Sequence, residues 1–262
     1  VDHYVPVLTV HGEKDELRAV LFGHACHPTT LSFTQWCGDY PGFAQIDIEQ
    51  NHPGTTAMFF NACGADQNPI PRRTVELCRK YGGMLARSVE EVLASPLKPV
   101  GPGLNTAFEF VDLAYQSVMT REELNESTKS DNAIHARWAK RMLARLDAGG
   151  TFASSYPFPV QAWKLGKEIL FIGIGGESVV DYSLNLKKTF GPGTWVCGYA
   201  NDQIAYIPSR RVWEEGGYEG GPHLDEYGHP AMRWAGDVEE RILTTVNRVV
   251  QKVNALDAAR RK

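Results

Sequence analysis

The sequence lacks several features that define whole classes of protein. No apolar run approaches the roughly 20 residues that a membrane-spanning helix needs, and no block of Lys and Arg precedes the last three residues. The 27 basic and 31 acidic residues give a formal net charge of −4, so the positive surface typical of a nucleic-acid-binding protein is missing. We therefore expect a soluble protein with no transmembrane segment and no nucleic-acid partner.

Cysteine is scarce, and the spacing of the cysteines matches neither a disulfide-stabilised fold nor a zinc-binding motif. The 5 cysteines are odd in number and include no Cys-x-x-Cys pair, which argues against a disulfide framework and against a structural zinc knuckle. The cysteine content is compatible with both an oxidising and a reducing compartment. The chain also starts at Val1 with neither an initiator Met nor a signal-peptide pattern, so we expect a processed chain or a fragment that lacks an upstream segment.

The composition that is present is that of an ordinary globular protein. The chain has 262 residues, of which 43% are hydrophobic and 22% charged, enough to bury a substantial core. Four short β-rich apolar runs, at residues 19–22, 57–60, 169–172 and 195–197, each end in glycine and polar residues. Such runs predict buried strands, and in open α/β sheets ligands bind beyond the carboxyl ends of the strands. The sequence predicts an α/β fold of mixed β-sheet layers covered by helices, with an active site at those ends.

The remaining patterns predict the order of elements in one domain, residues 1–262. Strands are expected at residues 5–10, 18–26, 57–62, 104–118, 158–165 and 168–174, three of which contain apolar runs named above. Helices are expected near residues 41–49, 74–94, 178–189 and 232–255. A capping-box pattern at residues 120–123 opens a helical segment that reaches about Leu146. Because this segment is rich in polar residues, we expect a peripheral helical segment at about 120–147.

Two histidines follow the second strand. His24 and His27 are three residues apart, and would share a face only in a helix; in an extended segment their side chains point to opposite sides. We therefore expect one of them to be functional, and His27, which precedes Pro28, is favoured. Asp39 stands just before a predicted helix, where a carboxylate is most simply an N-terminal cap or a partner of the helix dipole.

Other candidates have both a chemical and a structural interpretation. Glu177 follows Gly173-Ile-Gly-Gly176, where it could ligate a metal, act as a general base or cap the next helix. Asp66 and Asn68 follow a buried strand and fit a turn equally well. Cys26 and Cys63 could be catalytic thiols, but a small buried residue is the more common role of a free cysteine.

Five motifs in this order resemble the neutral/alkaline, non-lysosomal ceramidase family. They are Ala25-Cys-His27-Pro-Thr-Thr, Gly38-Asp39-Tyr-Pro-Gly-Phe-Ala, Asn61-Ala-Cys-Gly-Ala-Asp66-Gln-Asn68-Pro69, Gly175-Gly-Glu177, and the segment from Ala200-Asn-Asp-Gln-Ile-Ala-Tyr206 through Tyr218-Glu-Gly-Gly. The resemblance implies a zinc-containing α/β catalytic domain, often followed by an immunoglobulin-like domain. That family hydrolyses the amide of ceramide to sphingosine and a fatty acid.

The resemblance also implies roles for single residues. It makes His27, Glu177 and Tyr206 zinc ligands and Tyr218 a donor to the developing oxyanion. We also expect catalytic roles for Asp66 and Asn68 and substrate-binding roles for Asp39 and Gln67. The twelve-residue spacing of the two tyrosines agrees with the family pattern. Tyrosine is not a common zinc ligand on general grounds, so its role rests on the resemblance alone.

The chain departs from the family pattern in three ways. The family's first zinc histidine lies in a motif upstream of anything present here, Asn68 stands where the family has serine, and the chain ends with no room for an immunoglobulin-like domain. We therefore expect a partial ceramidase-like catalytic domain that is truncated at its N-terminus.

The function that follows is a zinc-dependent amide hydrolase that cleaves the N-acyl bond of ceramide or a related lipid through a metal-activated water. The expected partner is a small-molecule or lipid amide, with possible peripheral membrane contact, and the resemblance favours a secreted or periplasmic protein of sphingolipid metabolism. One alternative is a non-catalytic ceramidase-like binding domain that has lost a metal ligand. Another is a hydrolase that uses Cys26 or Cys63, which would be inactivated by thiol alkylation and indifferent to chelators.

Overall fold

The computed structural model describes residues 1–259 and shows the α/β architecture that the sequence predicts. Among these residues, strands form sheets of three, four and two strands, in the orders β1-β2-β3, β4-β5-β6-β8 and β7-β9. The chain divides into two compact units. Unit 1 comprises Val1–Leu104, Lys164–Phe171 and Val179–Tyr199, and unit 2 comprises Asn105–Trp163, Ile172–Ser178 and residues 200–259. The expectation of a single domain stays a prediction.

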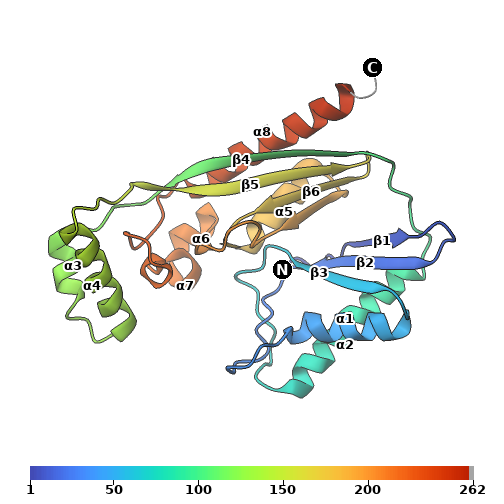
Figure 1. Ribbon diagram of the computed structural model, residues 1–262, viewed down its shortest axis with the longest axis horizontal. Coiled ribbons are helices and arrows are strands. Elements are labelled where there is room, and N and C mark those ends of the chain that lie inside the picture. The colour runs from blue at the N-terminus through green and yellow to red at the C-terminus, as the bar shows by residue number, and fades with distance from the viewer. Residues whose placement is uncertain (260–262) are drawn as a thin grey trace. The chain divides into compact units, whose positions relative to one another are not determined.

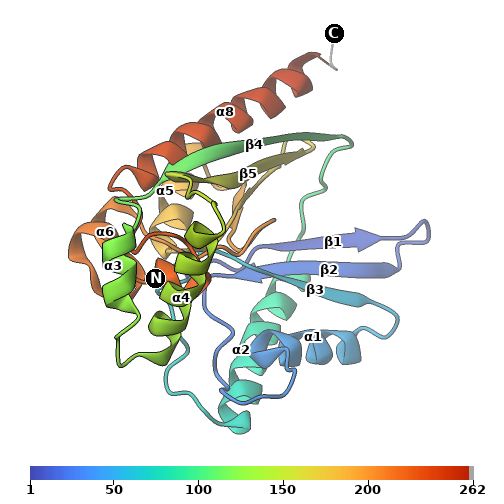
Figure 2. The same ribbon diagram turned by 60° about the vertical axis from the view of Figure 1, so that its left-hand side comes forward.

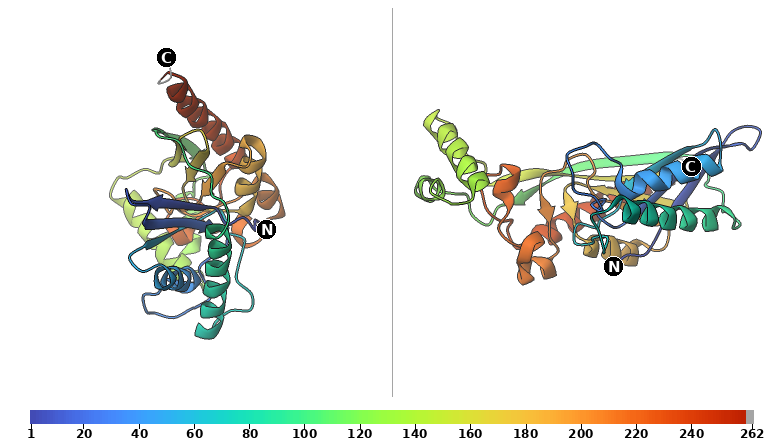
Figure 3. Two further views of the ribbon diagram at one scale, coloured as in Figure 1. Left: turned by 90° about the vertical axis from the view of Figure 1, so that its right-hand side faces the viewer. Right: turned by 90° about the horizontal axis from the view of Figure 1, so that it is seen from below.

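Unit 1 is built on a strand, helix, strand crossover. Strands β1 (Val7–His11) and β2 (Leu17–His24) pair antiparallel, and β3 (Thr56–Asn61) pairs parallel with β2. Helix α1 (Asp39–Asn51) connects β2 to β3, and it packs with α2 (Val75–Leu93) on one face of the sheet (Figures 1 and 3). The predicted order of strand, helix and strand is confirmed.

Alternation along β2 gives unit 1 a hydrophobic core on each face of its sheet. Val20 and Phe22 point toward α1 and α2 and are fully buried there. Leu21, one position out of step, packs on the opposite face with the side chains of Phe60 and Trp195. This second face is covered by α5 (Val180–Phe190) and β8 (Thr194–Cys197). Burial of both faces explains why β2 and β3 read as nearly continuous apolar runs.

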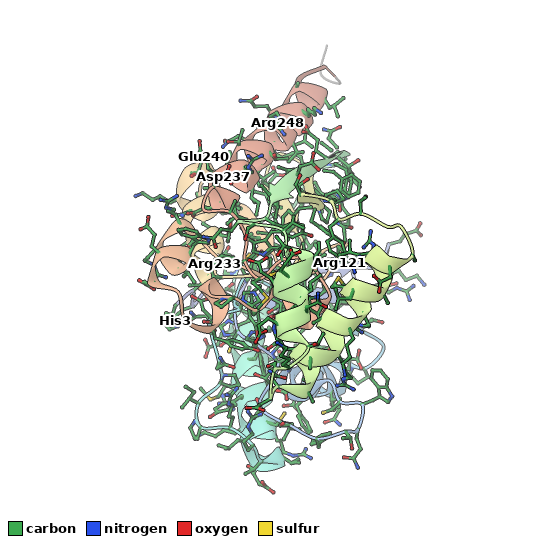
Figure 4. The ribbon with its side chains drawn as sticks, turned by 90° about the vertical axis from the view of Figure 1, so that its left-hand side faces the viewer. His3, Arg121, Arg233, Asp237, Glu240 and Arg248 are labelled. Carbon is green, nitrogen blue, oxygen red and sulfur yellow. The ribbon has the colours of Figure 1, made fainter. Side chains whose placement is uncertain are left out.

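Unit 2 contains most of the four-stranded sheet. Strands β4 (Leu104–Ala114) and β5 (Ser155–Leu165) are neighbours, and β6 (Ile169–Ile174) follows β5 after a short turn. Helix α8 (Val238–Ala259) runs beside β4, and Arg248, labelled in Figure 4, reaches Glu109 of that strand at 3.0 Å. Lys252 contacts the same carboxylate at 2.7 Å.

The peripheral helical segment forms two helices rather than one. Helix α3 (Arg121–Ser127) begins at the predicted capping box of Thr120 and Glu123, and α4 (Ala133–Asp147) begins after Asn132, whose side chain accepts hydrogen bonds from the first-turn amides. The strong cap at Asn132 starts a new helix where the sequence pattern predicts continuity. The two helices share a small core around Leu124 and Trp138.

Other boundaries and elements differ from the predictions. The last helix begins at Val238 and not at Met232, and β4 ends at Ala114 and not near residue 118. Five short elements were not predicted: β7 (Glu177–Ser178), β9 (Tyr206–Ile207), α6 (Arg210–Glu215), α7 (Gly217–Gly220) and the 3-10 helix η1 (Leu224–Tyr227). Elements of two to six residues are too short to show a hydrophobic period.

A buried histidine joins the segments of unit 2. The Nε2 atom of His229 lies 2.9 Å from the carbonyl oxygen of Ile204, and its Nδ1 atom lies 2.8 Å from the hydroxyl of Tyr115. Because a carbonyl can only accept, Nε2 carries the hydrogen, and Nδ1 accepts from Tyr115. Burial lowers the pKa of His229, so the folded protein holds this imidazole neutral.

We predict that unfolding free energy decreases as the pH falls below about 6.5, the ordinary histidine value. A histidine with a lowered folded pKa binds more protons in the unfolded state, so the stability present above the unfolded pKa is lost as pH falls through the folded pKa. The His229→Gln variant, whose amide can replace both hydrogen bonds, should show a shallower decrease in denaturant titrations between neutral pH and mildly acidic pH. Equal slopes for the two proteins would contradict the prediction.

Candidate functional site

The backbone of unit 2 places Glu177 directly beside Tyr206. The two residues are paired in the parallel register of β7 and β9. Gly176 precedes Glu177 with a positive φ of 62°, and a Cβ atom there would lie 2.6 Å from Cγ1 of Ile207 and 2.8 Å from the carbonyl oxygen of Ala205. Only glycine fits at this approach of the two strands, which explains why the Gly-Gly pair comes just before the carboxylate.

The Glu177 carboxylate is buried and surrounded by donors. Its residue is only 7% exposed, and Oε1 accepts hydrogen bonds from the Tyr227 hydroxyl at 2.6 Å and from Nε2 of Gln203 at 3.5 Å. The phenol of Tyr206 also hydrogen-bonds this side chain. Burial, and then the charge of Glu177, raise the pKa of Tyr206, and burial with the Glu177 hydrogen bond raises that of Tyr227. Both phenols therefore keep their protons and donate.

Tyr218, the predicted oxyanion donor, lies on a turn next to this pair. Its ring packs edge-on against Tyr206 with centroids 5.2 Å apart, and the residue is 59% exposed. The turn is fixed by Arg233, labelled in Figure 4, which donates to the carbonyl of Gly220 at 2.7 Å and to that of Trp213 and stacks over the Trp213 ring at 4.0 Å. Burial raises the pKa of Tyr218, so its hydroxyl is available as a donor at neutral pH.

The structure adds a residue that the sequence did not single out. His223 is buried, and its ring lies 5.4 Å from that of Tyr206 and 6.2 Å from that of Tyr227. Its nitrogens lie near the carbonyls of Gly221 and Tyr206, but within the part of the chain that the structure describes neither makes a well-aligned hydrogen bond. Burial lowers the pKa of His223. The only sequence signal was its place five residues after Tyr218 in the same loop.

We predict that Tyr227→Phe destabilises the protein by about 1.5–3 kcal/mol, the usual effect of losing a hydrogen bond to a charged group. The buried carboxylate of Glu177 loses the hydrogen bond from the Tyr227 hydroxyl at 2.6 Å, whereas the aromatic ring remains. Chemical denaturation would measure the change. Tyr81→Phe is the matched control, because the Tyr81 hydroxyl donates to the neutral, exposed carbonyl of Pro71, and its loss should cost about 1 kcal/mol or less. Equal losses in the two variants would contradict the prediction.

In unit 1 the two histidines have different surroundings. The backbone amide of His27 donates to the carbonyl of Gln67 at 2.9 Å, and its Nδ1 atom lies 3.1 Å from the Tyr199 hydroxyl. His24, still in β2, lines a cavity of about 410 Å³ together with Tyr40. Strand β2 ends at His24, and residues 25 and 26 form a bend before His27, so the extended segment expected between the two histidines is absent. The ring of His27 contacts the Tyr199 hydroxyl, and its functional role stays a prediction.

The polar residues after β3 are engaged by backbone groups and neighbouring side chains. Oδ1 of Asp66 accepts the amide of Val180 at 2.8 Å and so caps helix α5, whose own N-cap residue, Val179, has no capping side chain. Oδ1 of Asn68 accepts from the Thr29 hydroxyl and from Arg72. The catalytic roles predicted for Asp66 and Asn68 stay predictions.

The residues predicted to bind substrate also hold loops in place. The carboxylate of Asp39 accepts the backbone amides of Thr30, Leu31 and Tyr40, and Asp39 itself has a positive φ of 49° at the start of α1. The carbonyl of Gln67 accepts the amide of His27. These bonds fix the backbone on either side of His27, and the substrate-binding roles stay predictions.

We predict that Asp66→Ala lowers the unfolding free energy by about 1–2 kcal/mol through loss of a helix cap. Asp66→Asn should cost about 0.5 kcal/mol or less, since asparagine is an equally good cap acceptor. Comparing the two variants by denaturation separates the structural role of the oxygen from any catalytic role of the negative charge. If Asp66→Asn is as unstable as Asp66→Ala, the cap interpretation is wrong.

The thiols are poorly suited to nucleophilic catalysis. Burial raises the pKa of Cys26 to about 11, and its Sγ donates to the carbonyl of Gln67. Cys63 is completely buried, and burial raises its pKa well above the ordinary value. Because the thiolate is the reactive form, neither residue has the environment of an activated cysteine.

The predicted zinc ligands belong to different units of the fold. His27 lies in unit 1, whereas Glu177 and Tyr206 lie in unit 2, so the convergence of the three on one ion stays a prediction. Over residues 1–259, no three His, Cys, Asp or Glu side chains form a group that could hold a metal ion. The predicted set contains two side chains of these types, and its third member is a phenol.

The fold as a whole matches solved ceramidases. Neutral ceramidase from Pseudomonas aeruginosa superposes with a TM-score of 0.62 over 94% of this chain and 47% of that chain, at 16% sequence identity. The chain has the fold of part of a neutral ceramidase. A ceramidase complexed with C2 gives the same TM-score at 15% identity, over 94% of this chain and 48% of that chain. The chain therefore spans about half the length of each ceramidase that it matches.

Two further comparisons, with protein-family models and with curated protein sequences, found no match. None of the helices in residues 1–259 combines the length and the apolar content that crossing a bilayer requires.

Proposed function

We propose that this chain is part of a zinc-dependent amide hydrolase that cleaves the N-acyl bond of ceramide or a related N-acyl lipid. The observation that carries the proposal is the buried pair of Glu177 and Tyr206, held side by side by β7 and β9 within a ceramidase-like fold. A buried carboxylate is expensive to desolvate unless it is paired, and a bound metal ion is one partner that can offset that cost.

The donor chemistry of the proposed set fits zinc. An imidazole and a carboxylate are ordinary zinc ligands, and the Tyr206 phenol adds an oxygen beside Glu177. Because Tyr199 contacts Nδ1 of His27, Nε2 would be the nitrogen that binds the metal, as outer-shell partners fix the orientation of ligating histidines. When bound, zinc supplies Lewis-acid polarisation of a carbonyl and lowers the pKa of water.

The other residues have supporting parts in this proposal. Tyr227 and Gln203 donate to Oε1 of Glu177 and orient its carboxylate. Tyr218, protonated and partly exposed, would donate to the oxyanion of the tetrahedral intermediate, a contact whose loss typically costs about 10²–10³ in rate. In this view Asp66 and Asn68 order the loop that follows β3. The protein would act on lipid in a secreted or periplasmic setting, with peripheral contact to the membrane.

The second candidate is a ceramidase-like binding domain without catalytic activity. The residue that favours it is Asn68, where the family pattern has serine. The Asn68 side chain is already engaged by Thr29 and Arg72. Such a domain would bind an N-acyl lipid and release no fatty acid.

We predict about one zinc ion per chain, measured by mass spectrometry after dialysis of chelator-treated protein against zinc. Glu177→Gln and His27→Ala should each weaken zinc binding at least about tenfold. His52→Ala is the matched control, because His52 contacts Glu90 on the outside of α2, and it should bind zinc as the parent does. A stoichiometry near zero in the parent protein, or equal affinity in all variants, would reject the metal proposal.

Activity separates the three functional interpretations. Fatty-acid release from a short-chain ceramide should stop with a chelator, return with zinc and resist thiol alkylation. Binding of the ceramide without release would support the binding domain. Inactivation by alkylation with no effect of chelator would support a cysteine hydrolase and overturn the proposal.

A further inference from the structure

An uncharged loop of unit 1 presents large apolar side chains to solvent. Residues 31–38, Leu-Ser-Phe-Thr-Gln-Trp-Cys-Gly, contain no Asp, Glu, Lys or Arg. Trp36 is fully exposed and Phe33 is 45% exposed. A single exposed apolar residue is ordinary, but two aromatic residues in one uncharged loop form a surface that needs an explanation.

The base of this loop is rigid, so its exposed tip has a defined position. The carboxylate of Asp39 accepts the amides of Thr30 and Leu31, and the Leu31 side chain packs against the core beneath α1 and α2. Tyr40, the next residue, donates its hydroxyl to the carbonyl of Cys26 at 2.8 Å. The aromatic side chains therefore extend from an anchored segment.

A third exposed apolar side chain comes from the neighbouring loop. Ile70 is 81% exposed, and its loop is tied to the first by the Arg73 amide, which donates to the carbonyl of Thr30 at 2.6 Å, and by the Thr29 hydroxyl, which donates to Asn68 at 3.2 Å. Figures 1 and 2 show both segments at the end of unit 1 where α2 begins. We name Phe33, Trp36 and Ile70 the loop surface.

Positive charge lies beside the loop surface. Residues 69–87 contain five basic residues, Arg72, Arg73, Arg79, Lys80 and Arg87, and one acidic residue, Glu76. Arg73, Arg79 and Lys80 are exposed. The whole chain carries a net charge of −4, so this concentration of cations is local and not a property of the composition.

We propose that the loop surface, with the basic start of α2, docks on the interfacial region of an anionic lipid bilayer. Indole rings favour the boundary between headgroups and acyl chains, and clustered Lys and Arg are attracted by anionic headgroups. The absence of charge in residues 31–38 lets that loop enter the apolar boundary without desolvating an ion. The loop surface would make the peripheral membrane contact that belongs to the proposed function. Vesicle binding needs no catalysis, so it can fail or succeed independently of the hydrolase proposal.

The test is co-sedimentation of the protein with phosphatidylcholine vesicles prepared with and without phosphatidylserine. The parent protein should bind the anionic vesicles, and added salt should weaken this binding. Trp36→Ser should lower the partition coefficient about tenfold, in line with the loss of one interfacial anchor. Lys80→Gln with Arg79→Gln should weaken binding to anionic vesicles and make its salt dependence shallower. Phe110→Ser, a 61% exposed aromatic residue of β4 in unit 2, is the matched control and should bind as the parent does.

Fluorescence locates the contact and controls for folding. Brominated lipids should quench part of the tryptophan emission of the parent protein. Trp36→Phe keeps an aromatic anchor, so it should bind vesicles while losing that quenching. Because Trp36 is fully exposed, the unfolding midpoints of the Trp36 variants should equal that of the parent.

Three results would overturn the proposal: no binding to anionic vesicles, equal binding by Trp36→Ser and the parent, or quenching that survives in Trp36→Phe. A fourth is a concentration-dependent dimer, seen by sedimentation equilibrium, that Trp36→Ser abolishes. That result would assign the loop surface to a second copy of this chain.

Discussion

The buried carboxylate of Glu177 is the constraint around which unit 2 is arranged. Removing a carboxylate from water costs several kcal/mol unless hydrogen bonds replace the lost hydration, and here two phenols and an amide supply them. Each donor comes from a different short element: Tyr206 from β9, Tyr227 from η1, and Gln203 from the loop before β9. The irregular segment after residue 199 brings these three donors to one carboxylate, which a single regular helix or strand would not do.

Unit 1 uses its carboxylates in another way. Asp39 and Asp66 are the acidic residues nearest to His27 and Asn68 in the motifs, and both accept backbone amides in the structure. Each fixes the chain where it leaves a strand or enters a helix, so the positions of His27 and Asn68 depend on them. An acidic residue at the end of a strand can therefore serve a site without touching a substrate. Proximity in sequence to a functional motif does not distinguish the two roles.

The regular part of the fold was predictable because its signals are local. Alternation and apolar runs locate β2, β3 and β6, and the capping box at Thr120 locates the start of α3. The sequence predicts a polar loop over residues 201–221, since the elements there have at most six residues and are too short to show a repeating pattern. Contacts between distant residues were equally hidden: the cap of α5 by Asp66 joins positions 114 apart, and His223 meets Tyr206 only through the folded turn. The residue types of the zinc hypothesis came from the resemblance, and local pattern alone would have left Tyr206 as an ordinary packed tyrosine.

The cap that Asp66 provides has a mechanical consequence. Helix α5 begins on an oxygen supplied by the loop after β3, so one hydrogen bond joins the first turn of the helix to that loop. Neighbouring residues of that loop therefore serve two distant segments: Asp66 starts α5, and the backbone carbonyl of Gln67 accepts the His27 amide. A substitution that moves this loop would act on the start of the helix and on the backbone of the histidine together.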